Sequence, residues 1–189
     1  MYWISPSFQD DHFPRPWTRD AKIALFADRV RGWQIAIAQQ VASNVVNSGY
    51  AVLSILLSYF EMFAKYEDGF VGAGQSREYF RRGAQAVLGD FFPRDPTAAA
   101  ATADHLYEGV RCGLYHVGQT QGQVWLTEAL QGRPVMRVNE AITINPQLLV
   151  EHVRAHFGTY VAKLLDPSES DLRARFEARF DSDAGLSSP

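Results

Sequence analysis

The sequence predicts an all-α protein, an up-down helical bundle of five to six helices with a small β-hairpin insertion at about residues 123–144. Apolar residues recur every three to four positions in several long segments, which is the pattern of amphipathic helices. Only the stretch around residues 123–144 changes to short alternating or β-branched runs, which are typical of strands. With 189 residues, 47% of them hydrophobic, the chain is long enough for one domain with a substantial core.

The first segment differs from the rest because residues 1–17 are rich in proline and aromatic residues. They predict an extended N-terminal arm that packs against another surface. Thr18 is placed to cap a helix that starts at Arg19, and Asp20 favours its first turn. The helix should end near residue 47. Its apolar positions recur every three to four residues at Ile23, Phe26, Val30, Trp33, Ile37, Val41 and Val45.

Three further helices are expected in the middle of the chain. Residues 50–66 are apolar on most faces, so they predict the central buried helix of the bundle. Ser76 is placed to cap a third helix that ends near Leu88. A turn segment with two prolines follows, and Thr97 opens a fourth helix that continues to about Tyr115.

The pattern of the last third predicts short strands and then two helices. Asn145-Pro146 is a favourable helix start, so a helix should run from there to about Leu165. Ser168 is placed to cap a last helix that ends near Phe180. The short runs that precede these helices, read as two or three strands forming a hairpin, are 123–127, 135–138 and 142–144. The predicted organisation is an arm over 1–17, a single helical domain over 18–180 and a flexible tail over 181–189.

The overall composition narrows the classes of function. The net charge is -3 and the pI is near 5.9, whereas a general nucleic-acid binder carries a basic surplus, so any contact with RNA should be local. The single cysteine, Cys112, argues against an internal disulfide or a multi-cysteine metal site and suits a reducing compartment. No signal peptide is evident, and polar residues interrupt the apolar stretch at 50–64. We therefore expect a cytoplasmic protein without a membrane span.

The segment that carries chemistry is VRCGLYH, residues 110–116, near the end of the fourth helix. Arginine holds a phosphate or a phosphorane by paired hydrogen bonds, and histidine moves a proton near neutral pH. In an ideal α-helix Arg111 and His116 would lie roughly 140° apart. They can converge only if the helix ends or kinks between them, or if two copies meet across a dimer. Gly113 and Gly118 favour an end of the helix near His116.

The spacing of Arg111 and His116 resembles the Arg-x4-6-His signature of the HEPN superfamily, which includes many RNA-cutting toxins and anti-phage effectors. The context of residues 108–118 is similar to the motif helix of that family, as is the preceding apolar helix with its SYFE segment at 58–61. The resemblance covers mainly residues 50–116. The chain departs from the family pattern at Cys112, where a polar residue usually follows the arginine.

The resemblance implies a dimer whose two motifs line a composite cleft, and metal-independent cleavage that leaves a 2',3'-cyclic phosphate. Arg111 and His116 are the predicted catalytic residues: His116 as general base or acid, and Arg111 as the group that neutralises charge growing on the phosphate. The predicted supporting residues are Glu61, Glu108, Tyr115, Tyr59 and Cys112. A carboxylate among them would orient Arg111 or His116, and the tyrosines would stack a base or hydrogen bond the phosphate.

The resemblance also implies partners and a biological context. We expect a homodimer that acts on RNA, with a cognate antitoxin or a regulatory protein, in toxin–antitoxin function or phage defence. Arg77, Arg81 and Arg82 lie at helical spacing and could guide an RNA backbone, although a solvated helix face is the simpler interpretation. No cofactor and no metal is expected. His152 and His156 have the spacing of a zinc pair, but the sequence offers no third ligand nearby.

Three alternatives stay open on the sequence. Arg111 could form a structural ion pair with Glu108 or Glu61, with His116 capping the end of the helix. The chain could be a catalytically inactive HEPN-like module that binds a nucleotide or a protein. It could also be an unrelated helical dimerisation protein whose N-terminal arm wraps a neighbouring molecule.

Overall fold

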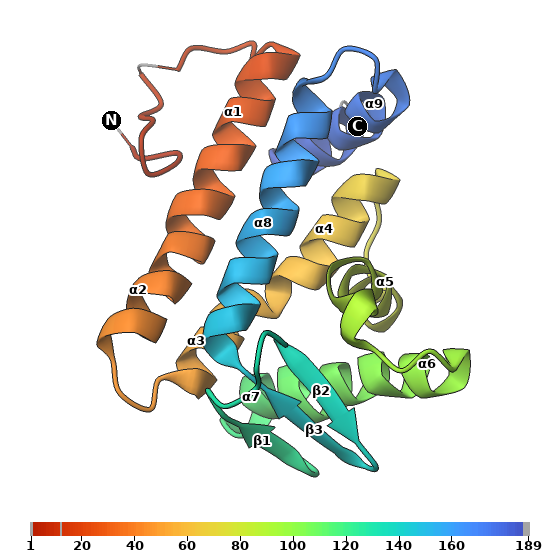
Figure 1. The fold of residues 1–189 in the computed structure, drawn as a ribbon. Helices are drawn as coiled ribbons and strands as arrows, with labels where there is room; N and C mark the ends of the chain where they lie inside the picture. The colour runs from red at the N-terminus through yellow and green to blue at the C-terminus, as the bar shows by residue number, and fades with distance from the viewer. Residues whose placement is uncertain (1, 12, 187–189) are drawn as a thin grey trace.

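The computed structural model describes residues 2–11 and 13–186, and it confirms a mainly helical fold (Figure 1). The buried residues of the helices form one hydrophobic core, and a small three-stranded sheet covers one end of the molecule. In the described part of the chain, no helix combines the length and the apolar character needed to cross a membrane.

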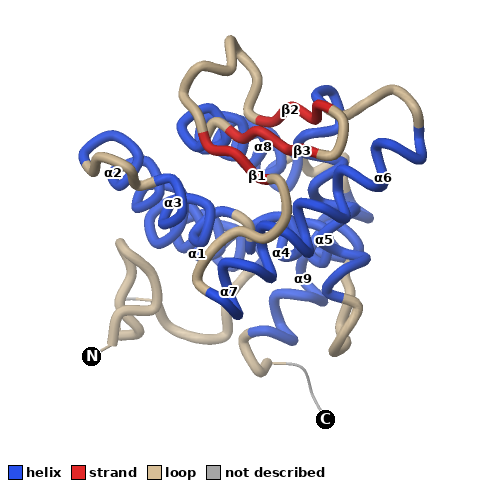
Figure 2. Tube along the Cα trace, turned by 90° about the horizontal axis from the view of Figure 1, so that it is seen from below, coloured by secondary structure: helices blue, strands red, loops and turns tan. Residues whose placement is uncertain are grey.

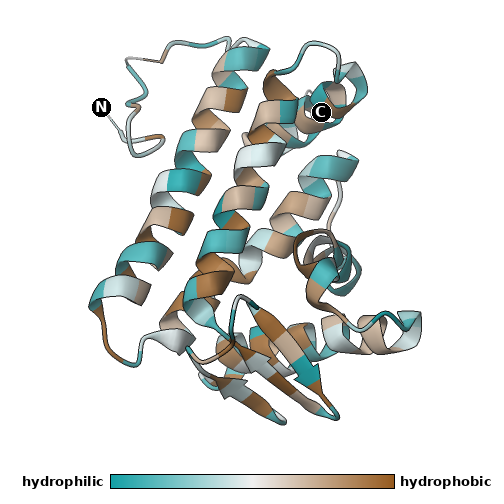
Figure 3. Cartoon of the chain, in the orientation of Figure 1, coloured by the Kyte–Doolittle hydropathy of each residue, from teal (hydrophilic) through white to brown (hydrophobic). Residues whose placement is uncertain are grey.

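The first long helix begins where the sequence predicts. Helix α1 spans Arg19–Arg29 and α2 spans Ala36–Asn44, and a π-helical segment, η1 (Val30–Ile35), joins them without a break. The Thr18 hydroxyl accepts a hydrogen bond from the backbone N–H of Ala21 at 3.2 Å, which confirms the predicted N-cap. Figure 3 shows hydrophobic and hydrophilic bands alternating along this helix, as expected for a helix with one buried face.

The N-terminal arm packs against the helices of its own chain. Asp28 of α1 accepts hydrogen bonds from the Ser5 hydroxyl at 2.5 Å and from the Ser7 backbone N–H at 2.8 Å. Burial by itself would raise the pKa of Asp28, but these hydrogen bonds lower it below its usual value. At the end of the arm, Trp17 is buried against Phe180, with ring centroids 5.9 Å apart. The described residues of the arm, 2–11 and 13–17, therefore pack on the helical part of the chain, whereas residues 1 and 12 lie outside the described residues.

The predicted central helix is divided into two. Helix α3 spans Gly49–Leu56 and α4 spans Ser58–Asp68, with the break at Leu57. Helix α4 packs along α5 (Ser76–Leu88), and a single 3₁₀ turn, η2 (Gly89–Phe91), follows α5. The break lets α3 and α4 take different directions, so that α4 reaches both α5 and the C-terminal helix.

Two serines predicted as N-caps do not cap helices. The Ser76 hydroxyl donates to Glu61 Oε1 at 2.7 Å, and the Ser168 hydroxyl donates to Asp166 Oδ1 at 2.7 Å. The last helix, α9 (Ser170–Asp183), begins after Ser168 and has no side-chain cap. Both predictions are wrong because the helices begin at other positions: Ser76 is already the first residue of α5, after Gln75 at the N-cap, and Ser168 lies before Glu169, the N-cap residue of α9.

The fourth predicted helix consists of three segments in one run: α6 (Pro96–His105), the π-helical segment η3 (Leu106–Cys112) and α7 (Gly113–Val117). The Asp95 side chain accepts the N-cap hydrogen bond at 2.8 Å, so α6 begins one residue before the predicted Thr97. The predicted motif thus lies where η3 passes into α7.

The insertion at residues 123–144 is a three-stranded sheet rather than a simple hairpin. Its strands β1 (Val124–Leu126), β2 (Val135–Val138) and β3 (Ala141–Ile144) lie in the order β1-β3-β2. The pair β2–β3 is the predicted antiparallel hairpin, whereas β1 runs parallel to β3, with Val124 opposite Ile142. Figure 2 shows β3 between β1 and β2, and Figure 1 shows the sheet at the same end of the molecule as α6 and α7.

The two C-terminal helices complete the bundle. Helix α8 spans Pro146–Leu165 as predicted, and the Asn145 side chain caps its first turn. The predicted flexible tail at 181–189 is wrong in its first part, because α9 continues to Asp183. Residues 187–189 of that predicted tail lie outside the described residues.

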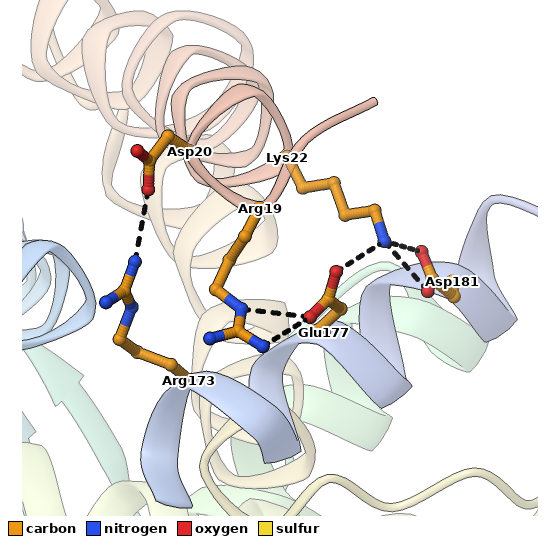
Figure 4. Close-up of polar contacts among 6 residues, drawn as sticks. All are labelled: Arg19, Asp20, Lys22, Arg173, Glu177 and Asp181. Atoms are coloured by element: carbon orange, nitrogen blue, oxygen red, sulfur yellow. Dashed lines mark hydrogen bonds and ion pairs between the residues drawn. The ribbon is translucent and has the colours of Figure 1, made fainter. Parts of the chain in front are cut away.

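Ion pairs join the first helix to the last (Figure 4). Lys22 Nζ lies 2.8 Å from Glu177 Oε1 and 2.8 Å from Asp181 Oδ1, and Arg19 Nη2 lies 2.9 Å from Glu177 Oε2. The Lys22 side chain is only 10% exposed. Burial by itself would lower the pKa of Lys22, but its two carboxylate partners raise it above its usual value. These contacts hold α1 and α9 side by side.

Candidate functional site

The helix that carries the predicted motif changes its winding at the motif. Segment η3 is π-helical through Arg111 and Cys112, and α-helical winding resumes at Gly113. Short π-helical insertions are rare and occur frequently at functional sites. Helix α7 then ends at Val117, and Gly118 follows in the left-handed conformation with φ 76°. The predicted end of the helix near His116 is therefore confirmed.

Arg111 is held between one carboxylate and two aromatic rings. Its Nη2 atom lies 3.4 Å from Glu61 Oε2. Its guanidinium carbon lies 5.4 Å from the centroid of the Tyr107 ring and 5.4 Å from that of Tyr115. The side chain keeps 25% of its surface exposed, so an oriented cation remains accessible to solvent.

Glu61 is the centre of a polar cluster beneath Arg111. Besides its contact with Arg111, its Oε1 atom accepts hydrogen bonds from Lys65 Nζ and from the Ser76 hydroxyl, both at 2.7 Å. Burial by itself would raise the pKa of Glu61, but these hydrogen bonds, with the charges of Lys65 and Arg111, lower it below its usual value. Glu61 is therefore a carboxylate at neutral pH and attracts the Arg111 guanidinium.

His116 lies on the exposed end of α7, beside Tyr115. The ring centroids of these two neighbours are 6.2 Å apart, and Tyr115 itself is 73% exposed. Within the described residues, no hydrogen bond, ion pair or ring contact joins His116 to Arg111. Tyr115 contacts both side chains, and the chain on its own does not bring Arg111 and His116 together.

Two glycines of the motif region allow the following loop to lie against the helix. The backbone N–H of Gln121 donates to the carbonyl of Gly109 at 2.7 Å. A Cβ atom at Gly109 would lie 2.8 Å from the Gln121 carbonyl oxygen, and one at Gly113 would lie 2.6 Å from the Gln119 carbonyl oxygen. Any side chain at either position would push the loop away, so these glycines fix the surface on which the motif lies.

Glu108 and the three arginines of α5 form ion pairs that do not include Arg111. Arg77 binds Asp104 at 3.0 Å and Glu108 at 3.0 Å, and Arg81 lies 3.5 Å from Asp104. Arg82 instead pairs with Asp68 of α4 at 3.2 Å. Glu108 therefore contacts Arg77 and not Arg111, which leaves Glu61 as the carboxylate that orients Arg111. The predicted RNA-guiding arginines are all engaged with carboxylates.

Tyr59 lies inside the core, whereas Cys112 is part of the motif and is half-buried. Tyr59 is fully buried, and its hydroxyl is hydrogen bonded to His156 Nδ1 at 2.8 Å. It cannot stack on a base, so that prediction is wrong: the apolar helix on which Tyr59 lies is central to the core. Cys112 is half-buried beside Tyr107, and burial, followed by the nearness of Cys112, raises the pKa of Tyr107.

Three residues around Arg111 and Glu61 were not predicted from the sequence: Tyr107, Lys65 and Ser76. Spacing along a helix could have identified two of them. Tyr107 lies four residues before Arg111, and Lys65 lies four residues after Glu61, so each pair can meet on one helix face. Ser76 has no such signal, because its bond to Glu61 depends on the packing of α5 on α4.

The described histidines and acids do not gather around a metal. Over residues 2–11 and 13–186, no three side chains of His, Cys, Asp or Glu form a group that could hold an ion. His152 packs edge-on against Phe91, and His156 binds Tyr59, so the two histidines do not form a pair of ligands.

Comparison of the chain with protein-family models, with curated proteins and with solved structures gives no match.

Proposed function

We propose that this chain is a metal-independent endoribonuclease of the HEPN type, acting as a homodimer with a composite site at the interface. The observation that carries the proposal is the surface formed by the end of η3 and by α7, where Arg111 and His116 lie beside the exposed side chains of Tyr115 and Val117. Tyr115 is 73% exposed and Val117 is 52% exposed, directly on either side of His116. A second copy of the chain placed on this surface would cover both and would bring its own motif to the first.

In the proposed reaction His116 removes the proton of an RNA 2'-hydroxyl, and the 2' oxygen attacks the adjacent phosphorus. The bond from phosphorus to the 5' oxygen breaks, the 5' oxygen takes the proton back from His116, and a 2',3'-cyclic phosphate remains. Arg111 neutralises the charge that grows on the phosphate oxygens, in the orientation that Glu61 gives it. Tyr115 offers an exposed ring on which a base can stack.

Because Arg111 and His116 do not touch within one described chain, we place Arg111 of one subunit opposite His116 of the partner subunit. The acidic pI of about 5.9 suits recognition of one RNA target rather than general RNA binding. The proposed setting is a cytoplasmic toxin–antitoxin or phage-defence system, with an antitoxin or a regulatory protein as a further partner. The setting follows from the HEPN resemblance alone.

Cleavage of mixed RNA in the presence of EDTA tests the proposed reaction. Arg111→Ala and His116→Ala should each lower the cleavage rate by about a hundredfold or more, since each removes one of two groups that act on the reacting atoms. Arg154→Ala is the matched control, because Arg154 is an exposed arginine on α8, away from the motif. Circular dichroism should show that all variants keep their helices. Equal cleavage by wild type and His116→Ala would contradict the proposal.

Sedimentation of a double variant, Tyr115→Asp with Val117→Asp, tests the proposed interface. The two charges should convert the dimer into monomers and abolish cleavage with it, because a buried unpaired carboxylate is costly. The matched control is Trp125→Asp, which places a charge on another exposed aromatic position, 63% exposed, in β1. A dimer that survives the double change would place the interface elsewhere.

A second function is favoured by one observation, the contact of Arg111 with Glu61 at 3.4 Å. In a catalytically inactive HEPN-like module that binds a nucleotide or a protein, this pair would be structural. Arg111→Ala would then lower the melting temperature, and wild type and variant would both lack cleavage. A normal melting temperature together with lost cleavage would support the ribonuclease.

A further inference from the structure

The outer surface of α2 and α3 is apolar and carries no charged residue. From residue 32 to residue 60 the chain contains no Asp, Glu, Lys, Arg or His, and this range includes all of α2 and α3. We call the surface the α2–α3 face and define it by its exposed apolar side chains, Trp33, Ile37, Val45, Val46 and Tyr50. Depletion of charge together with exposed apolar and aromatic side chains is the composition of the core of a protein interface.

Three of these side chains form a ridge along one continuous helical run. Trp33, Ile37 and Val45 recur at a spacing of four residues, and the partly buried Val41 completes the row. Side chains at this spacing are neighbours on a helix surface, and such rows are the ridges that pack into the grooves of another helix. Ala38, on the inner side of α2, is fully buried. The fold of the chain therefore uses the inner side of α2 and leaves the ridge uncovered.

The polar side chains around the ridge are of kinds that can pair with themselves. They are amides and a hydroxyl, all exposed: Gln39, Gln40, Ser43, Asn44 and Asn47. Amide and hydroxyl groups both donate and accept hydrogen bonds, so each can bond to the same group of a second copy. A charged residue near a twofold axis meets its own copy instead, and like charges repel. The chemistry of the α2–α3 face therefore suits a second copy of this chain.

The α2–α3 face continues into the surface of α7. Helix α3 packs against α7, and the hydroxyls of Tyr50 in α3 and Thr120 in the loop after α7 are hydrogen bonded at 3.1 Å. Helix α7 has only five residues. A stable interface covers roughly 800 Å² of each partner, with about 20–30 residues on each side. Tyr115 and Val117 do not supply such an area, so a second copy that covers α7 needs a neighbouring surface as well.

We propose that the α2–α3 face is the larger part of the homodimer interface, covered by the same second copy that covers the end of α7. The ridge is buried between the subunits, and the surrounding amides form hydrogen bonds from one subunit to the other. The part assigned to α7 rests on the proposed ribonuclease. Association can be measured without RNA, so the interface and the ribonuclease activity can fail separately.

Sedimentation equilibrium of the full chain measures the dissociation constant of the dimer. Trp33→Glu with Ile37→Glu places two carboxylates on the ridge and should raise the dissociation constant about a hundredfold or more, because a buried unpaired charge is costly. Gln85→Glu with Ala86→Glu is the matched control. It adds the same charge at two exposed positions of α5, which Figures 1 and 2 show on the other side of the molecule from α2, and it should leave the dissociation constant unchanged.

A second variant, Ile37→Ala with Val45→Ala, adds no charge and favours the helix. It should raise the dissociation constant about tenfold, because each subunit loses apolar area from the interface. Circular dichroism should show that all variants keep their helices.

The proposed interface is overturned if both ridge variants associate as tightly as wild type. It is also overturned if wild type stays monomeric up to its highest soluble concentration. A monomer that binds neutral phosphatidylcholine vesicles, and loses this binding in Trp33→Glu with Ile37→Glu, would assign the face to a membrane instead. A wild type that dimerises through the ridge but cleaves no RNA would support the interface and contradict the ribonuclease.

Discussion

The ion pairs between α1 and α9 differ from those around Arg111 in how completely the cations are paired. Lys22 has two carboxylate partners at 2.8 Å and is 10% exposed. Arg111 has a single carboxylate at 3.4 Å and is 25% exposed. A cation with short contacts to two acids has little left to offer a ligand, and its role is structural. A cation with one long contact, between two rings, keeps donors for a substrate. Lys22 therefore stabilises the fold, whereas Arg111 is free to bind a substrate.

The largest expected change in stability follows Lys22→Met. This substitution keeps the apolar stem but leaves Glu177 and Asp181 without their buried cation. We expect the free energy of unfolding to fall by about 2 kcal/mol, measured by urea denaturation, with no change in RNA cleavage per folded molecule. Arg154→Ala, an exposed position, should change it by less than about 0.5 kcal/mol. A loss of cleavage in folded Lys22→Met would contradict a purely structural role of Lys22.

Glu61→Gln should have a smaller effect on stability and an effect on activity as well. The amide weakens the contacts to Lys65, Ser76 and Arg111, so we expect a loss of about 1–2 kcal/mol in unfolding free energy. Cleavage should fall about tenfold, because Arg111 loses its orienting charge. Glu108→Gln is the control: it weakens only the exposed pair with Arg77, and its cleavage should stay near that of wild type.

Gly118→Ala tests the end of α7. Gly118 has φ 76°, which an alanine adopts only with strain, so the free energy of unfolding should fall by about 1 kcal/mol. Calorimetry measures both this variant and a control, Gly158→Ala, at a position on α8 where a Cβ atom meets nothing within 4 Å. There alanine should be neutral or stabilising. Equal losses at the two glycines would show that the conformation of Gly118 is not what defines this helix end.

The smallest expected difference is in the dependence of stability on pH. The pKa of Glu177 is lowered from 4.5 in the folded protein, chiefly by its hydrogen bond from Lys22. A lowered pKa stabilises the fold above pH 4.5, and this contribution disappears as the pH falls through the lowered value. Unfolding free energy should therefore decline less steeply below pH 4.5 in Glu177→Gln than in wild type. The pKa of Lys22 is raised above 10.5, so its contribution is lost only at a pH beyond that value.

Much of the helical framework was predictable, because local patterns fix it. The apolar repeat located the long first helix, and Asn145-Pro146 located the start of α8. The sheet was predicted only in its local part: the hairpin β2–β3 joins neighbouring strands, whereas the parallel pairing of β1 with β3 depends on contacts across the fold. The break at Leu57 has no glycine or proline beside it. Each π-helical segment contains one glycine, Gly32 or Gly109, but a glycine inside a helical pattern does not by itself predict π-helical winding.

The sequence predicted several residues of the candidate site, but it predicted few of the contacts that these residues make. The spacing singled out Arg111 and His116, and Glu61 does lie against Arg111. The sequence could not show that Tyr59 lies inside the core or that Glu108 turns to Arg77, since both depend on how α4, α5 and η3 pack. Side chains on one helix can be compared by spacing, but contacts between helices require the fold.

The most direct test of the central claim is complementation between two inactive variants. Arg111→Ala and His116→Ala are purified, shown to be dimeric, mixed under conditions that exchange subunits, and assayed for RNA cleavage with EDTA. If Arg111 of one subunit acts with His116 of the partner subunit, a mixed dimer has one intact site. Half of the dimers are mixed, so roughly a quarter of the wild-type activity should return. No recovery after confirmed exchange would contradict a composite site built from Arg111 and His116.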